Sequence, residues 1–448
     1  MTWQLTTPNR FPYLLLIGFF FGILCCHETH GQLAQPLSSI RDWQMVSTEN
    51  IDIYAPADQI EGAAKAARFA ELARYEIGIL YDYGPKNRFT LIYTESPLAL
   101  MQTNLNWKEG GLAPGEIDLP DHVEIIIHPG TTAGLYQEVK EAMARAIIAQ
   151  FSFGDQLGTS IQTELLLYNA KWFYDGLASY VASGWTFEDE QWMASLSPSN
   201  LAELAIDVDS RIQDIIRKSI WHFITHEYGE QKISEIVYLV TISHSIESGI
   251  ISVLGITLNT LTLRWERYIA NRLESVVSQR SAFEDLGGDE WIEAPKGTTI
   301  AGMDYHHGSD RVAMYLNRSG KLYVDIYDPG EKEWVHTPIS TGYMRSDAHK
   351  LSFQMPVSWT PNGKAVIAPI WKNGRLVLKK YSLEEKEVEE IALPRQMIHL
   401  HAIKFAPNGE KMVISGQVNG KADLYMKAGG GRWRQLTDDP YDETDPLW

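Results

Sequence analysis

The sequence predicts a multidomain protein with an α/β (α+β) part whose second half is mostly helical, followed by an all-β part. Three observations support this. Strand and helix patterns alternate over residues 45–280, whereas short strands separated by turns follow residue 298. The chain of 448 residues is also too long for one ordinary domain.

The composition is that of a folded, acidic protein. Apolar residues make up 44% of the chain, and 14 Trp contribute to that share, which is enough for large cores. The net charge of -18 argues against nucleic acid or an anionic membrane surface as a partner. We therefore expect no nucleic-acid partner, and membrane attachment only through an N-terminal anchor.

Residues 1–31 read as a secretory signal peptide with the apolar run FPYLLLIGFFFGILCC. Cleavage near Gly31 is favoured by its small side chain. Lipoprotein processing at Cys25 or Cys26 is the first alternative, and a retained anchor is the second. The expected location is the periplasm or cell envelope, with lipid anchoring left open. Both Cys lie in this segment, so cleavage at Gly31 would leave a mature chain without cysteine.

The first domain, residues 32–280, begins with strands and continues with helices. Strands are predicted over 45–56, 88–95 and 122–129, with an Ala-rich helix over 57–81 and a Gly- and Pro-bearing loop over 106–121. Helices are predicted over 135–151, 163–183, 210–228, 231–241 and 258–277, with Thr257 as the N-cap of the last. The acidic stretch 281–297 reads as a linker.

A repeat organises residues 298–448. PVSWTPNGKAVIAP aligns with AIKFAPNGEKMVIS, and the turn prolines Pro361 and Pro407 are 46 residues apart. Four strands in a period of about 40–50 residues indicate a β-propeller blade. We expect about three blades and the opening strand of another. Because a propeller needs more blades to close, we interpret the chain as a fragment of a longer protein.

In the order of its motifs, the chain resembles a known pair of domains. NIDIYAP, the helix 135–151, WFYDGLASY, HFITHEYGEQKI and GITLNTLTLRWERYI resemble landmarks of the peptidase MA-like (gluzincin) domain of bacterial envelope proteins. The blades, with LTDDPYDETDPLW, resemble TolB-type propeller repeats. This resemblance implies a zincin-like fold, followed by a propeller, in an envelope protein.

The zinc motif of that family is missing. The resemblance places Asp175 at the position of the third zinc ligand and Lys140-Glu141-Ala142-Met143-Ala144 at the position of HExxH. Glu141 then occupies the position of the general base, without the two His ligands. A second register puts Met143 and Ile147 at the His positions. No His occurs between His128 and His222, so neither register supplies an imidazole. Catalytic zinc needs three protein ligands, so we expect an inactive homologue without metal or cofactor.

Other candidate sites are weaker. His222 and His226 lie at i, i+4 and could share a metal, but packing is the favoured interpretation. The His residues of the blades are expected to be solvated loop residues, and the acidic run near the C-terminus a solvated turn rather than a Ca²⁺ site. These are His306, His307, His399 and His401, and Asp438, Asp439, Asp442, Glu443 and Asp445.

The sequence therefore predicts an exported binding or scaffold protein of the bacterial envelope. Its partners would be envelope or secreted proteins, bound by the propeller or by the peptidase-like cleft. One alternative is a zinc metallopeptidase or other hydrolase with an atypical site. Another is glycan binding at the cell surface.

Overall fold

The computed structural model describes most of the chain after its N-terminal segment. The described residues are 43–95, 106–108, 111–113, 123–128, 130–153, 171–194, 211–278, 292, 295, 297–318, 321–343, 355–372, 375–394 and 396–448. The predicted signal peptide, nearly all of the linker and the first part of the predicted helix 163–183 lie outside them.

A four-stranded mixed sheet opens the α/β part, in the order β1-β2-β3-β6. β1 (Trp43–Ser47) is antiparallel to β2 (Ile51–Pro56), while β3 (Phe89–Thr94) and β6 (Val123–Ile127) run parallel to β2. Two short strands, β4 (Asn106–Lys108) and β5 (Gly111–Ala113), form a hairpin where the sequence predicts only a loop.

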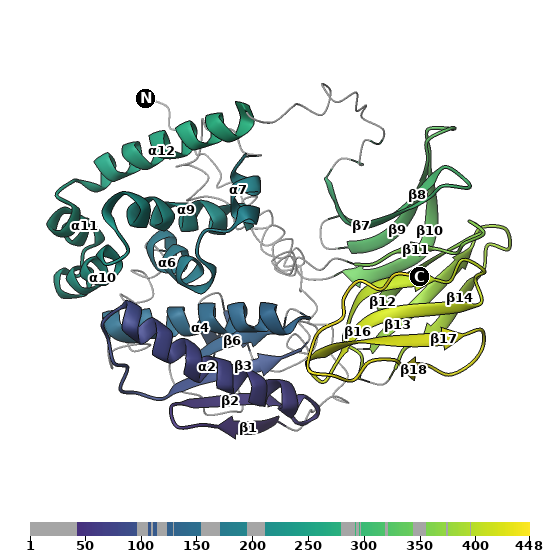
Figure 1. Ribbon diagram of the computed structural model, residues 1–448, viewed down its shortest axis with the longest axis horizontal. Coiled ribbons are helices and arrows are strands. Elements are labelled where there is room, and N and C mark those ends of the chain that lie inside the picture. The colour runs from purple at the N-terminus through teal and green to yellow at the C-terminus, as the bar shows by residue number, and fades with distance from the viewer. Residues whose placement is uncertain are drawn as a thin grey trace, which may run out of the picture. The chain divides into compact units, whose positions relative to one another are not determined.

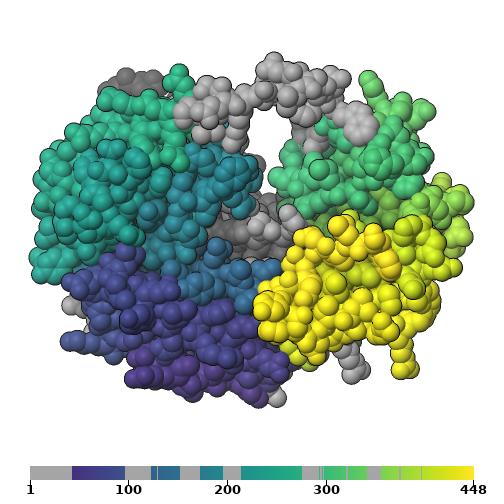
Figure 2. All heavy atoms as spheres, viewed as in Figure 1, coloured from purple at the N-terminus to yellow at the C-terminus, as the bar shows by residue number. Residues whose placement is uncertain are grey.

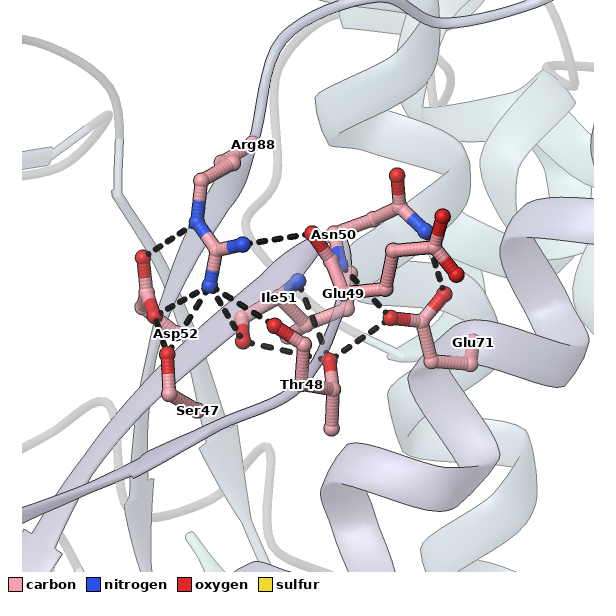
Figure 3. A network of polar contacts seen from close by, with 8 residues as sticks. All are labelled: Ser47, Thr48, Glu49, Asn50, Ile51, Asp52, Glu71 and Arg88. Carbon is pink, nitrogen blue, oxygen red and sulfur yellow. Dashed lines mark hydrogen bonds and ion pairs between the residues drawn. The ribbon is translucent and has the colours of Figure 1, made fainter.

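A tight turn divides the single strand that the sequence predicts over 45–56. Arg88 binds both carboxylate oxygens of Asp52 (2.9 and 2.6 Å) and donates to the carbonyl of Thr48 (2.9 Å). On the other side Glu71 accepts hydrogen bonds from the hydroxyl of Thr48 (2.6 Å) and the backbone N–H of Asn50 (2.8 Å). This network fixes β1 and β2 as a hairpin (Figure 3).

Helices cover one side of this sheet in successive layers (Figure 1). After the 3₁₀ turn η2 (Ala57–Gln59), α2 (Ile60–Leu80) and α4 (Thr132–Phe153) pack on the sheet. α2 can lie close to it because its buried face is almost all alanine: Ala63, Ala66, Ala67, Ala70 and Ala73. α6 (Lys171–Ser183) packs on α4, and α9 (Arg211–Tyr228) packs on α6.

The remaining helices, which are teal in Figure 2, complete this block. They are α7 (Phe187–Ala194), α10 (Lys232–Ser243), α11 (Ile246–Leu254) and α12 (Leu258–Ser278). Thr257 caps α12 as predicted, since its hydroxyl accepts from the N–H of Thr260 (3.2 Å). The sequence prediction missed α7 and α11.

One apolar core joins the sheet and these helices. Trp221 and Trp265 are its largest fully buried side chains, and each indole N–H has a partner: the carbonyl of Phe173 (2.9 Å) and the hydroxyl of Ser219 (2.9 Å). Buried indoles need such partners, so these bonds fix the position of α9 against α6 and α12. Among the described residues no single helix is long and apolar enough to cross a membrane. The bent pair Ile246–Leu254 and Leu258–Glu274 meets that criterion only when taken together.

The described part of residues 298–448 forms three four-stranded antiparallel sheets of the propeller-blade type. The first contains β7 (Thr298–His306), β8 (Arg311–Arg318), β9 (Lys321–Asp328) and β10 (Glu333–Tyr343). The second contains β11 (Ser358–Trp359), β12 (Ala365–Lys372), β13 (Arg375–Ser382) and β14 (Val388–Ala392). The third contains β15 (His399–Phe405), β16 (Lys411–Val418), β17 (Lys421–Ala428) and β18 (Arg434–Gln435). The four-stranded repeat predicted from the sequence is present.

The turns of the repeat use glycine at positive φ. Gly363 and Gly409, in the two Pro-Asn-Gly turns, have φ of 67° and 73°. The hairpin between β16 and β17 has two residues, Asn419 and Gly420, both at positive φ (53° and 72°), as a type I′ turn requires. Gly420 lies against helix α2, because an added Cβ would stand 3.2 Å from the Cα of Gly62.

Candidate functional site: paired charges on helices α4 and α6

Glu141 lies on α4 at the border with α6. One of its carboxylate oxygens, Oε1, accepts hydrogen bonds from the guanidinium of Arg145 (2.7 Å) and the hydroxyl of Ser179 (3.1 Å). Ser179 belongs to α6, one turn beyond Asp175. Glu141 is therefore bound to an internal cation and a hydroxyl, as a charge-paired group rather than a free base.

Arg145 connects Glu141 to the sheet. Its Nε donates to Glu124 of strand β6 (3.0 Å). Burial opposes the charge of Arg145, but the carboxylates of Glu124, Glu141 and Glu138 outweigh it and raise the pKa of the guanidinium. Burial and the neighbouring charge of Glu141 raise the pKa of Glu138 to about 7. One arginine thus faces three carboxyl groups, and one of these is close to its titration point at neutral pH.

Asp175 turns toward a different helix. Its carboxylate lies 3.8 Å from Arg217 of α9, which also contacts Asp214 (3.3 Å) and Gln213 (2.8 Å). The next residue, Gly176, allows this approach, because an added Cβ would stand 2.6 Å from the carbonyl oxygen of Arg217. The DGLA segment therefore serves the packing of α6 on α9.

The two positions that would carry imidazoles have other roles. Lys140, at the first His position, forms an ion pair with Glu76 of α2 (2.8 Å). Ala144, at the second, is fully buried in the core. In the second register both positions, Met143 and Ile147, are fully buried apolar side chains. Neither register offers a metal ligand at its His positions.

The charged side chains at these positions form ion pairs within the chain. At the positions that the sequence resemblance assigns to a zinc site, the chain has three separate ion pairs: Glu141 with Arg145, Asp175 with Arg217, and Lys140 with Glu76. In the part of the chain that the structure describes, no three His, Cys, Asp or Glu side chains are grouped so that they could hold a metal ion.

His222 and His226 share one face of α9, with ring centroids 6.2 Å apart. The ring of His222 stacks on Trp185 (4.9 Å, 6°), and its Nε2 is 3.1 Å from the hydroxyl of Tyr268. Burial and the charges of Arg272 and His226 lower the pKa of His222 to about 4. These contacts of His222 are those of a packed aromatic ring.

Three of the four blade histidines differ from the expectation of solvated loop residues, and His307 matches it. His399 is buried, and its Nε2 lies 2.9 Å from the carbonyl of Glu95. His401 is half-buried, with Nε2 3.1 Å from the carbonyl of Gly130. His306 lies 2.9 Å from the hydroxyl of Ser309, while His307 remains exposed. The prediction was wrong for His399 because its partner is a carbonyl some 300 residues away.

The acidic run is also more than a solvated turn. Asp438 is exposed and pairs with Lys421 (2.7 Å). Asp442, however, accepts a hydrogen bond from the backbone N–H of Thr132 (2.6 Å), the first residue of α4, and another from the N–H of Ala422 (3.2 Å). A carboxylate at the N-terminus of a helix stabilises it by bonding free N–H groups and by opposing the helix dipole.

Sequence reasoning missed the arginines of this site. The i, i+4 spacing of Glu141 and Arg145 is a signal that could have identified their pair. The pairing of Asp175 with Arg217 had no such signal, because it depends on how α6 packs on α9.

Comparison with known proteins gives one partial similarity. No family model matches the chain. The Tol-Pal system protein TolB of Anaeromyxobacter dehalogenans strain 2CP-C is 22% identical over 149 residues, which is 32% of this chain and 34% of the relative. TolB of strain 2CP-1 of the same organism gives the same figures. The similarity is to TolB.

This similarity is weak and local, since the chain spans about a third of the length of these relatives. Among solved structures, TolB from Acinetobacter baumannii aligns with a TM-score of 0.28 and 17% identity, covering 36% of this chain and 37% of that one. Hydrazine synthase of Kuenenia stuttgartiensis gives 0.25 and 16%, covering 33% of this chain and 44% of that one. Such TM-scores are too low to carry an argument.

Proposed function

We propose that this chain is an exported, non-catalytic binding or scaffold protein of the bacterial cell envelope, in which a relic metallopeptidase-like domain precedes TolB-like blades. The observation that carries the proposal is the set of three ion pairs at the relic positions. Glu141 and Asp175, the two carboxylates that the resemblance assigns to a zinc site, each form an ion pair with an arginine of the chain itself. General-base catalysis needs a carboxylate free to accept a proton from water.

The envelope part of the proposal rests on two supports. One is the apolar N-terminal segment that reads as a secretory signal. The other is the partial similarity to a Tol-Pal system protein. A role in protein–protein interaction follows from the same comparison, with the blade sheets or the peptidase-like domain as the contact surface.

A first experiment separates this proposal from the hydrolase alternative. The purified full chain is assayed for zinc by elemental analysis and for cleavage of unstructured protein, beside His222→Ala. We expect substoichiometric zinc and no cleavage in either protein. Stoichiometric zinc that disappears in His222→Ala, or cleavage abolished by that substitution, would overturn the non-catalytic assignment.

A second experiment tests location and role. The tagged chain is expressed in a Gram-negative host, the cells are fractionated, and partners are fixed by cross-linking in intact cells before purification. We expect the mature chain in the envelope fraction, cross-linked to a defined envelope protein. Recovery in the cytosol contradicts the export step, and glycan binding without any protein partner favours the glycan alternative.

A further inference from the structure

A pocket of about 330 Å³ lies where the ends of three helices meet. Its walls are the last turns of α2 and α6, the middle of α4 and the turn after α9. Glu76, Ile77, Leu80, Lys140, Tyr180, Val181, Gly184 and Glu230 line it. The volume is at the lower end of the range for ligand pockets.

The electrostatics of the pocket favour a cation. α2 ends at Leu80, α6 at Ser183 and α9 at Tyr228, and Leu80, Gly184 and Glu230 line the pocket, so the C-terminal ends of three helices, which carry partial negative charge, lie at or near it. The carboxylate of Glu230 adds a full negative charge at the exposed mouth.

The one basic lining residue, Lys140, does not cancel this field. Its Nζ is bound to Glu76 (2.8 Å), which also accepts from the hydroxyl of Tyr136 (2.8 Å). Its hydrogen bond with Lys140 lowers the pKa of Glu76, so the pair is ionised and neutral overall at neutral pH. The charge of Glu230 and of the helix ends therefore remains uncompensated by the lining residues.

The walls favour an aliphatic stem behind that cation. Ile77, Leu80 and Val181 supply apolar surface, and the ring of Tyr180 is fixed by a hydrogen bond between its hydroxyl and Thr225 (2.7 Å). Lysine and arginine combine an apolar stem with a charged head, and both can lie against an aromatic ring.

We propose that this pocket binds a basic side chain, lysine or arginine, presented by a protein partner. The inference deepens the proposed binding function and rests on it, since it assigns a contact point to the relic domain. The shared ligand chemistry is an ammonium or guanidinium group on an aliphatic stem. A protein source is favoured because Glu230 at the mouth is exposed, so a basic side chain on the surface of a partner can reach it.

Selective ¹⁵N-glycine labelling of the full chain gives a local readout, because Gly184 lines the pocket and Gly229 precedes Glu230. The Gly184 signal is assigned with Gly184→Asn, since asparagine tolerates the positive φ of 61° at this position. The probes are the blocked amino acids Nα-acetyl-lysine amide, Nα-acetyl-arginine amide, Nα-acetyl-norleucine amide and Nα-acetyl-glutamate amide.

We expect the two basic probes to shift Gly184 and Gly229 saturably, while Gly363 and Gly409 of the blade turns stay unchanged. Glu230→Gln should weaken this binding about two- to five-fold, the range of an exposed ion pair. The matched control Glu247→Gln, an exposed glutamate in α11, should leave it unchanged. Glu230 is exposed, so its substitution keeps the fold.

Equal binding of the norleucine probe, preference for the glutamate probe, no saturable shift, or an unchanged affinity in Glu230→Gln would each overturn the proposal. A titration with spermidine tests for a free amine as the ligand. If spermidine binds more tightly than blocked lysine, the ligand is a small polyamine and not a protein. Failure of these titrations is distinguishable from failure of the proposed function, which is decided by zinc content, cleavage and envelope cross-linking.

Discussion

Arg145 directly follows Ala144, the second His position in one of the two registers that the resemblance allows. Its guanidinium joins Glu141 of the same helix to Glu124 of strand β6. A cation that is part of the chain cannot be removed by a chelator. At the scale of single residues, the charge pattern of this helix therefore suits a permanent structural contact.

Replacement of Arg145 tests that role. Arg145→Met removes the cation and leaves Glu124, Glu141 and Glu138 facing one another, so we expect the free energy of unfolding to fall by about 2 kcal/mol. The measurement is urea unfolding followed by tryptophan fluorescence. The control Lys364→Met breaks an exposed pair with Glu384 and should change stability by less than about 0.5 kcal/mol. Equal effects of the two substitutions would contradict a structural role for Arg145.

His128, at the end of strand β6, gives a prediction about pH. Its ring is fully buried, and burial, together with the charges of His399 and Lys65, lowers its pKa to about 3. Below its ordinary pKa of 6.5 the unfolded chain binds a proton that the folded chain excludes. Stability from this group is therefore lost as pH falls, by about 2 kcal/mol between pH 7 and pH 5.

The variant His128→Asn isolates this effect. An asparagine oxygen can accept the hydrogen bond that the ring nitrogen takes from the N–H of Gly130 (3.0 Å), but it does not titrate in this range. Between pH 7 and pH 5 the variant should lose about 2 kcal/mol less stability than the parent, measured by urea unfolding at each pH. Parallel pH profiles would show that His128 is protonated in the folded chain.

At the scale of the elements, the sequence predicts the long helices and the strands well because their patterns are strong and local. The missed helix α7 had a readable signal. Thr186 and Asp189 form a capping box, in which the hydroxyl of Thr186 accepts from the N–H of Asp189 (3.2 Å) and Asp189 accepts from the N–H of Thr186 (2.8 Å). The division of β1 from β2 had none, since Arg88 and Glu71 reach the turn only after folding.

The contact of α6 with α9 depends on one glycine. In Gly176→Ala the added Cβ would stand 2.6 Å from the carbonyl oxygen of Arg217, a backbone atom that cannot move away easily. Alanine is the better helix former, yet we expect a loss of about 1–3 kcal/mol because overpacking outweighs propensity. Thermal unfolding followed by circular dichroism measures it.

Gly430→Ala is the matched control, because nothing lies within 4 Å of a Cβ added there and φ is not positive. It should leave the unfolding temperature nearly unchanged. A Gly176→Ala protein as stable as the parent would show that α6 can shift relative to α9 without cost.

At the scale of the whole molecule, the sequence predicts the order of an α/β part and a four-stranded repeat, because periodicity and the Pro-Asn-Gly turns are visible along the chain. It could not predict which side chains of one part form contacts with the other part. The ion pairs of Asp175 with Arg217 and of Lys140 with Glu76, and the hydrogen bond that Asp442 accepts from the N–H of Thr132, join residues distant in sequence. Such contacts follow from packing, which a single sequence does not reveal.

Asp442 tests whether the third blade sheet supports helix α4. Asp442→Ala removes hydrogen bonds to Thr132 and Ala422, and we expect a loss of about 1–2 kcal/mol, as for other caps. Asp442→Asn keeps an acceptor oxygen and should lose less. Asp445→Ala, an exposed neighbour, is the control. Urea midpoints compare the four proteins, and an Asp442→Ala midpoint equal to that of the parent would contradict the cap.

The two-residue turn at Asn419 and Gly420 has a consequence for the lifetime of the protein. Asn-Gly is the sequence most prone to spontaneous deamidation, because a glycine N–H can attack the asparagine side chain without hindrance. The resulting isoaspartate adds a carbon to the backbone. The added carbon would lie in the turn at which Gly420 packs against α2, where even a Cβ added to Gly420 would stand only 3.2 Å from the Cα of Gly62. The hairpin packs closely against helix α2, and its Asn-Gly sequence therefore limits how long that contact stays chemically intact.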